Sequence, residues 1–215
     1  MTESLPPVID LLAVLAYGEL SAFDRMSEDA RLAPDLARRA TMSEMAGAEI
    51  AHYRRLADRL TELGVDPVDA MTPFMVAIDE YHDQTQPRDW LEGLVKAYVG
   101  DAIADDFYRE VAGFLGGPDG KLILDVLHED RYADFVAGEI RGAIEADPKV
   151  ANRLALWARR LVGEALSQAQ RVAAEREALT EVVIQGSGDL TALNAMFKRL
   201  TSAHTARMEA VGLNT

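Results

Sequence analysis

The sequence predicts an all-α protein built on a bundle of four long helices, with further helices after them. Ala, Leu, Glu and Arg are abundant and runs of β-branched residues are almost absent, a composition that favours helices. Apolar residues also recur at three- and four-residue intervals over long segments, as on the buried face of a helix. Of the 215 residues 49% are hydrophobic, so we expect one domain with one sizeable core, spanning residues 1–215.

Proline and glycine mark the limits of the first two helices. A proline pair ending at Pro7 opens the first helix, which we expect to run to about Arg31. Pro34 stands near the start of the second helix, which should continue to Leu63 and stop at Gly64. These two helices would form the first antiparallel hairpin.

A longer connection separates this hairpin from a second one. It contains a shorter helix, expected at about 73–82. The third long helix should run from about 87 to 116, and the fourth from about 121 to 146. Short links within two hairpins and a long crossover between them are typical of ferritin-like four-helix bundles. The core bundle would therefore occupy residues 7–146.

The C-terminal addition, residues 147–215, predicts two more helices, at about 149–182 and 190–211. The first of them carries a broad apolar band that includes Leu154, Trp157 and Leu161. The band can pack on the four-helix core, or part of it can form an interface between two copies of the chain. We expect a homodimer.

Each of the four core helices carries carboxylates on its apolar stripe. Glu19 lies on the first helix, Glu49 on the second, Asp101 on the third and Glu129 on the fourth. Unpaired buried carboxylates are strongly disfavoured, and a divalent cation would neutralise them. Together these positions predict a metal site inside the bundle.

An imidazole supports the same interpretation. His52 follows Glu49 by three residues, so both lie on one face of a helix, one turn apart. Mixed carboxylate and imidazole ligands suit iron or manganese. Tyr132 stands where a second histidine would complete a two-metal site, and Asp105, one turn after Asp101, is an alternative ligand on the third helix.

Four segments carry a family resemblance: LAYGELSAFDRMSEDARLAP, AEIAHYRRL, LVKAYVGDAIADDFYREVA and RRLVGEALSQAQRVAAERE. They are similar to the actinobacterial ferritin-like proteins grouped as MiaE-like, and the similarity covers nearly the whole chain. The resemblance to MiaE proper is more remote. MiaE hydroxylates the isopentenyl group of a modified adenosine in tRNA with dioxygen and a di-iron centre.

This resemblance implies an iron-dependent hydroxylase or monooxygenase with a degenerate metal site. By position, the ligands would be Glu19, Glu49, His52, Asp101 and Glu129, holding one or two iron ions, with manganese as another candidate. The substrate would be a small molecule or a nucleoside, and no catalytic residue can be assigned. Because Tyr132 replaces a histidine, the alternative function is a non-catalytic binding or interaction module that has lost the metal.

The remaining features of the composition indicate the compartment in which we expect the protein. The chain has no cysteine, which excludes disulfides and thiolate catalysis and fits a reducing cytoplasm. It has no apolar run of the roughly 18 residues that a membrane span requires, so we expect a cytoplasmic protein without membrane contact.

The net charge of −14 predicts that this chain does not bind tRNA directly. Its arginine clusters are too few to offset the repulsion between the protein and the phosphates, which salt screens over roughly 8 Å. We expect no measurable complex in a filter-binding titration at about 150 mM salt. A complex with micromolar affinity would contradict this expectation.

Overall fold

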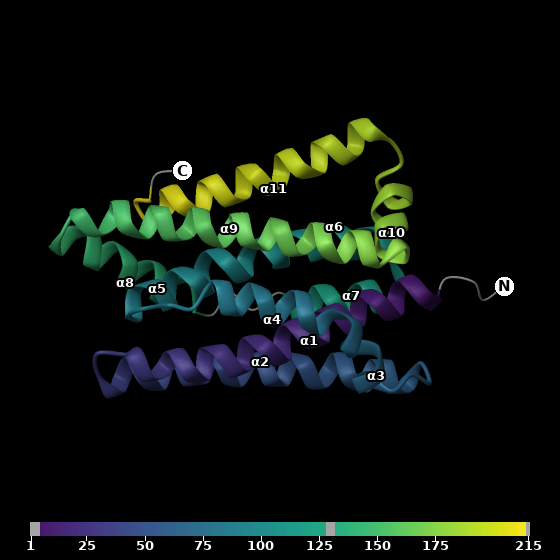
Figure 1. Ribbon diagram of the computed structural model, residues 1–215, viewed down its shortest axis with the longest axis horizontal. Coiled ribbons are helices and arrows are strands. Elements are labelled where there is room, and N and C mark those ends of the chain that lie inside the picture. Colours follow the sequence, from purple (N-terminus) through teal and green to yellow (C-terminus); the bar gives the residue numbers. More distant parts are fainter. Residues whose placement is uncertain (1–4, 128–131, 214–215) are drawn as a thin grey trace.

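The computed structural model describes residues 5–127 and 132–213 and confirms the all-α fold class, since these residues contain helices and turns but no strand. The first two helices, α1 (Leu5–Asp29) and α2 (Leu36–Glu62), lie side by side as the predicted antiparallel hairpin (Figure 1). No helix in the described part of the chain has both the length and the apolar character of a membrane span.

The connection between the hairpins contains more helix than expected. It consists of α3 (Pro67–Met71), a 3-10 turn (Thr72–Phe74) and α4 (Met75–Gln84). Phe74 and Ala77 are buried, so the connection contributes to the core. The helix α4 packs against α1 and against the later helix α9.

The third core helix is interrupted where the sequence predicted a continuous one. It consists of α5 (Trp90–Val95), a π-helical segment (Lys96–Asp101) and α6 (Ala102–Leu115). A π-helical turn contains more residues than an α-helical turn, so residues before and after it no longer share the face that α-helical spacing assigns to them.

The prediction of one continuous helix at 121–146 is wrong, because this part of the chain forms two helices, α7 (Gly117–Val126) and α8 (Ala133–Ala146). The side chain of Arg109 on α6 donates to the carbonyl oxygen of Leu127, which follows the last residue of α7. This contact satisfies one of the carbonyl groups that every helix leaves unpaired at its C-terminus.

The C-terminal part consists of α9 (Lys149–Glu175), α10 (Glu177–Ser187) and α11 (Leu190–Ala210). The single helix expected at 149–182 is broken at Arg176, whose φ of −127° and ψ of 81° are not helical. The break turns α10 away from α9, and α11 then runs back along the molecule (Figure 1).

Arginines attach the C-terminal helices to the core through carboxylates. The pairs are Arg153 with Glu92, Arg171 with Glu80, Arg176 with Asp10, Arg199 with Glu110 and Arg207 with Asp106. The acidic partners lie on α1, α4, α5 and α6, and the basic partners lie on α9, on α11 and at the break between α9 and α10. These five arginines therefore pair with acids of the protein itself.

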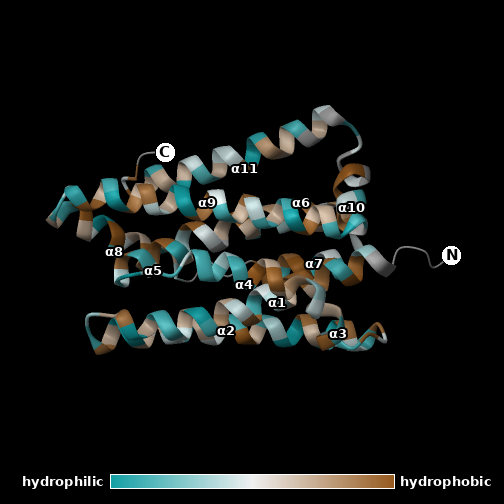
Figure 2. Ribbon diagram, viewed as in Figure 1, coloured by the Kyte–Doolittle hydropathy of each residue, from teal (hydrophilic) through white to brown (hydrophobic). Residues whose placement is uncertain are grey.

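The buried apolar residues form two clusters. One joins the N-terminal half of α1 to the C-terminal half of α2 and to α7, and it includes Leu12, Leu56 and Phe74. The other joins the opposite halves of α1 and α2 to α8, α9 and α11, and it includes Met42 and Leu161. Figure 2 shows dense hydrophobic colour on α1 and α7, where the first cluster lies.

The apolar band of α9 packs mainly into the second cluster. Leu154 and Leu161 are fully buried, and the indole N–H of Trp157 donates to the carbonyl oxygen of Glu92 at 2.9 Å. Leu156 and Leu166 remain exposed on the outer side of α9. The expected homodimer stays a prediction.

The ion pair between Arg176 and Asp10 should contribute strongly to the stability of the protein. Asp10 is buried and accepts from two nitrogen atoms of the guanidinium group. Arg176→Ala would leave this carboxylate without its partner, and we expect a loss of about 2–3 kcal/mol in the free energy of unfolding in urea. The control Arg171→Ala breaks an exposed pair and should lose less than about 1 kcal/mol. Equal losses in the two variants would contradict this prediction.

Candidate metal centre

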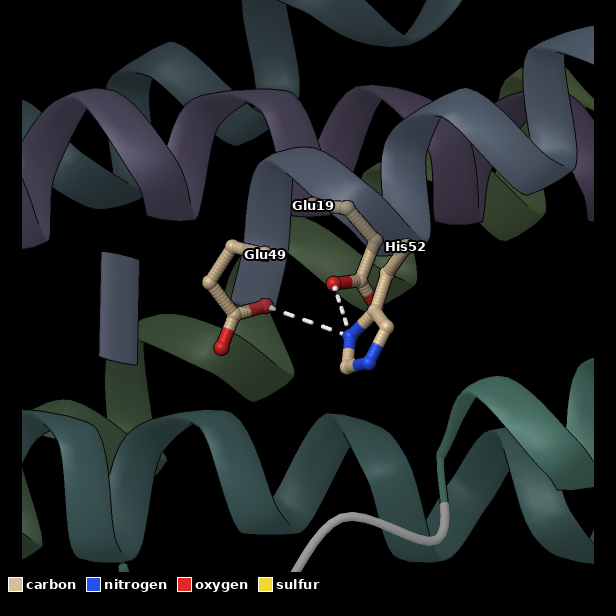
Figure 3. A group of neighbouring side chains, drawn as sticks. All are labelled: Glu19, Glu49 and His52. Carbon is tan, nitrogen blue, oxygen red and sulfur yellow. Dashed lines mark hydrogen bonds and ion pairs between the residues drawn. The ribbon is translucent and has the colours of Figure 1, made fainter. Parts of the chain in front are cut away.

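Three of the predicted ligands come together at the contact between α1 and α2. Glu19 lies in the middle of α1, and Glu49 and His52 lie one turn apart in the middle of α2. Both helices are long and regular here, so the positions read from α-helical spacing hold. Figure 3 shows the three side chains directed toward one another.

The group lies at the junction of the two apolar clusters. On α1, Glu19 stands between Ala16 of the first cluster and Met26 of the second. On α2, Glu49 and His52 stand between Ala46 and Leu56, which belong to different clusters. The apolar seam between the two helices is therefore interrupted at this level by polar side chains from both of them.

The distances within the group are short. The Nδ1 atom of His52 lies 3.2 Å from Oε2 of Glu19 and 3.9 Å from Oε2 of Glu49. The side chain of Glu19 is 10% exposed, that of His52 13% and that of Glu49 23%. The site is therefore largely shielded, with Glu49 nearest to solvent.

The geometry and the chemistry of these donors fit one divalent cation. One potential ligand atom from each residue lies within 4.8 Å of the other two. Atoms bound to the same ion at about 2.1 Å lie roughly 3–4 Å apart, so small side-chain rotations would close the group around an ion. Two carboxylates and one imidazole form a donor set suited to iron or manganese.

The candidates on the third core helix are placed differently. Asp101 ends the π-helical segment, and its side chain lies outside the part of the chain that the structure describes. Asp105 on α6 is about a third exposed, and its carboxylate lies 4.0 Å from the guanidinium group of Arg109. The structure thus gives Asp105 a basic neighbour outside the group of Glu19, Glu49 and His52.

A tyrosine lies beside these carboxylates. Burial raises the pKa of the Tyr108 hydroxyl, and the negative charges of Asp105 and Glu19 raise it further. Tyr108 therefore stays a neutral phenol at physiological pH and presents a hydrogen-bond donor near the site.

Of the two candidate ligands on the expected fourth helix, the structure describes only Tyr132. Glu129 lies outside the described residues. The hydroxyl of Tyr132 donates to the carboxylate of Glu44, an exposed residue of α2, at 3.3 Å. Tyr132 immediately precedes α8 and packs partly against the second apolar cluster.

Sequence reasoning missed a second group of polar residues. His82 was not among the predicted site residues, yet it is 5% exposed, and burial lowers its pKa to about 3. Lys96 and Asp29 lie near it, and Lys96 is also buried. The signal that could have identified His82 is its position four residues after Ile78, on the side of the connection that faces the core.

Comparison with known proteins identifies one related family. Residues 5–186 match the family model described as a ferritin-like domain of actinomycetes. No curated protein matches the chain.

The buried Asp29 predicts a specific dependence of stability on pH. Burial raises the pKa of its carboxyl from 3.8 to about 6, although the nearby Lys96 acts in the opposite direction. The stability that the protonated form contributes is full below about pH 3.8 and is lost as the pH rises through about 6. Asp29→Asn removes this loss, because asparagine does not ionise. The free energy of unfolding of the variant minus that of the wild type should therefore rise by about 1 kcal/mol from about pH 5 to about pH 8, after allowance for partial exposure.

Urea unfolding at the two pH values measures this difference. Asp83→Asn is the control, because it removes an exposed carboxylate from the adjacent helix α4. A stability difference between Asp29→Asn and the wild type that does not change with pH would contradict the prediction.

Proposed function

Because the chain belongs to the family of actinomycete ferritin-like domains, we propose that it binds one iron or manganese ion through Glu19, Glu49 and His52. The convergence of these three side chains from two neighbouring helices is the observation that carries this proposal. The proposal is for one ion because these three side chains converge on a single position.

The protein contributes shielding and positioning to such a site. Glu19 is almost fully buried, so its carboxylate is poorly hydrated when no ion is bound. Glu49 and His52 are held one turn apart by the same regular helix, which fixes their separation. Coordination would replace the close contact between Nδ1 of His52 and Oε2 of Glu19.

We further propose that the metal site supports an oxygen-dependent hydroxylation. A bound iron ion would supply the activation of dioxygen, as the resemblance to MiaE-like proteins implies. The apolar clusters on both sides of the ligands support this proposal, because they exclude water from the site. Tyr108, kept neutral by burial, would offer a hydrogen-bond donor near Glu19.

The alternative function is a binding or interaction module without metal. The specific observation in its favour is the contact between His52 and Glu19, in which an Nδ1–H group can donate to the carboxylate. Such a contact reduces the unfavourable burial of Glu19 without any ion. Metal binding and its effect on stability distinguish the two functions.

Metal analysis tests the proposal directly. Protein loaded with Fe²⁺ or Mn²⁺ without oxygen and then desalted should retain about one ion per chain. Glu49→Ala removes a ligand and should reduce retention at least about tenfold, whereas Asp58→Ala, which removes an exposed carboxylate from the same helix, should retain the ion. The wild type should also melt at a higher temperature with the ion, because binding to the folded state stabilises it.

Two results would contradict the proposal. Equal occupancy of two ions per chain would show that more ligands take part than the three residues on α1 and α2. Protein that retains no metal and whose melting temperature does not change with either ion would favour the binding module.

A further inference from the structure

A second polar site lies between α1, α4 and the start of the π-helical segment. It is a cavity of about 10 Å³ whose polar lining consists of Arg25, Asp29, His82 and Lys96. Met42 contributes to its apolar wall. None of the four polar residues belongs to the candidate metal centre, so this is a separate site.

His82 lines this cavity, and one of its ring nitrogens requires a hydrogen-bond partner. Its Nδ1 atom is inaccessible to solvent and has no hydrogen-bond partner among the described residues. A buried polar atom without a partner is strongly disfavoured, and such atoms in proteins are normally satisfied by ordered water when no protein group is available. The low pKa of His82, about 3, means that the ring is neutral at physiological pH.

Lys96 gives the cavity a fixed positive charge. Its ammonium group is buried, donates to the carbonyl oxygen of Thr85 at 2.9 Å and lies over the ring of Tyr81. These contacts hold the lysine side chain on the wall of the cavity. An ammonium group has three N–H donors, so the bond to Thr85 does not use all of them.

Asp29 supplies a carboxyl group to the lining of the same cavity, close enough to Lys96 to feel its charge. Its carboxylate packs against Gly93, where a Cβ atom would lie 3.7 Å from Oδ2. Arg25 lies at the outer side, with its guanidinium group 3.5 Å from Glu28 and from Asp83. Charged and polar groups that line one small cavity can be bridged by an ordered water molecule.

We propose that this cavity binds one ordered water molecule, which accepts hydrogen bonds from Lys96 and Arg25 and donates hydrogen bonds to Asp29 and Nδ1 of His82. The volume is close to the minimum that a single water requires. The four groups offer two donors and two acceptors, which matches the capacity of a water molecule. The water would connect three helical elements that are distant in the sequence.

The same set of two donors and two acceptors argues against a halide or an ammonium ion in this cavity. A halide can only accept hydrogen bonds, so it would face the Asp29 carboxylate and the lone pair of His82 unfavourably. An ammonium ion can only donate, so it would face Lys96 and Arg25 unfavourably. Water alone among these three ligands can both accept and donate.

A high-resolution crystal structure of the full chain tests the proposal. We expect a density peak in the cavity, within hydrogen-bond distance of Nδ1 of His82 and of Lys96 or Asp29, that has no anomalous signal in a crystal soaked in bromide. A bromide signal at this position would overturn the proposal in favour of an anion site. An empty cavity, or a protein group bonded to Nδ1 of His82, would also overturn it.

Nitrogen NMR of the histidine rings tests the hydrogen-bond pattern in solution. We expect the ring of His82 to carry its proton on Nε2 and to keep an unprotonated Nδ1 at neutral pH, because Nδ1 accepts from the water. The His82→Gln variant identifies the signal by its loss. A proton on Nδ1 would overturn the proposal, since the site would then offer an excess of donors.

Discussion

The antiparallel contact between α1 and α2 is the interaction on which the rest of this structure depends. Each helix presents an apolar stripe to the other, and each stripe is interrupted at the same level by carboxylates, with an imidazole added from α2. Because apolar clusters pack on both sides of this level, the polar side chains have little access to water. They must satisfy one another or bind a cation, and this constraint makes the junction the centre of the molecule's chemistry.

The sequence was sufficient for the first hairpin and for the ligands that it carries. Over α1 and α2 the α-helical period is uninterrupted, so Glu19, Glu49 and His52 could be assigned to facing stripes from their spacing alone. The third helix is not the continuous α-helix that the sequence predicted, because the π-helical segment ending at Asp101 changes which residues share a face. Nothing in the local composition distinguishes this segment from the α-helix around it.

Tertiary packing decided the features that the sequence did not predict. His82 lies outside the apolar stripes of the four predicted core helices, yet the packing of α4 against α1 and α9 buries it. The long fourth helix was also expected from its periodicity, whereas the chain leaves helical geometry after Val126, where Arg109 reaches the carbonyl oxygen of Leu127. In both places contacts between distant residues override local preference.

The arginines of the C-terminal helices have a consequence for how the protein can be divided. Acids of α1, α5 and α6 pair with Arg153, Arg176 and Arg207, which come from the last third of the chain. Basic residues in the last third of the sequence thus neutralise acidic residues in the first two thirds. A fragment that ends before α9 would lose these counterions together with an apolar covering. We therefore expect such a fragment to be less stable than the whole chain.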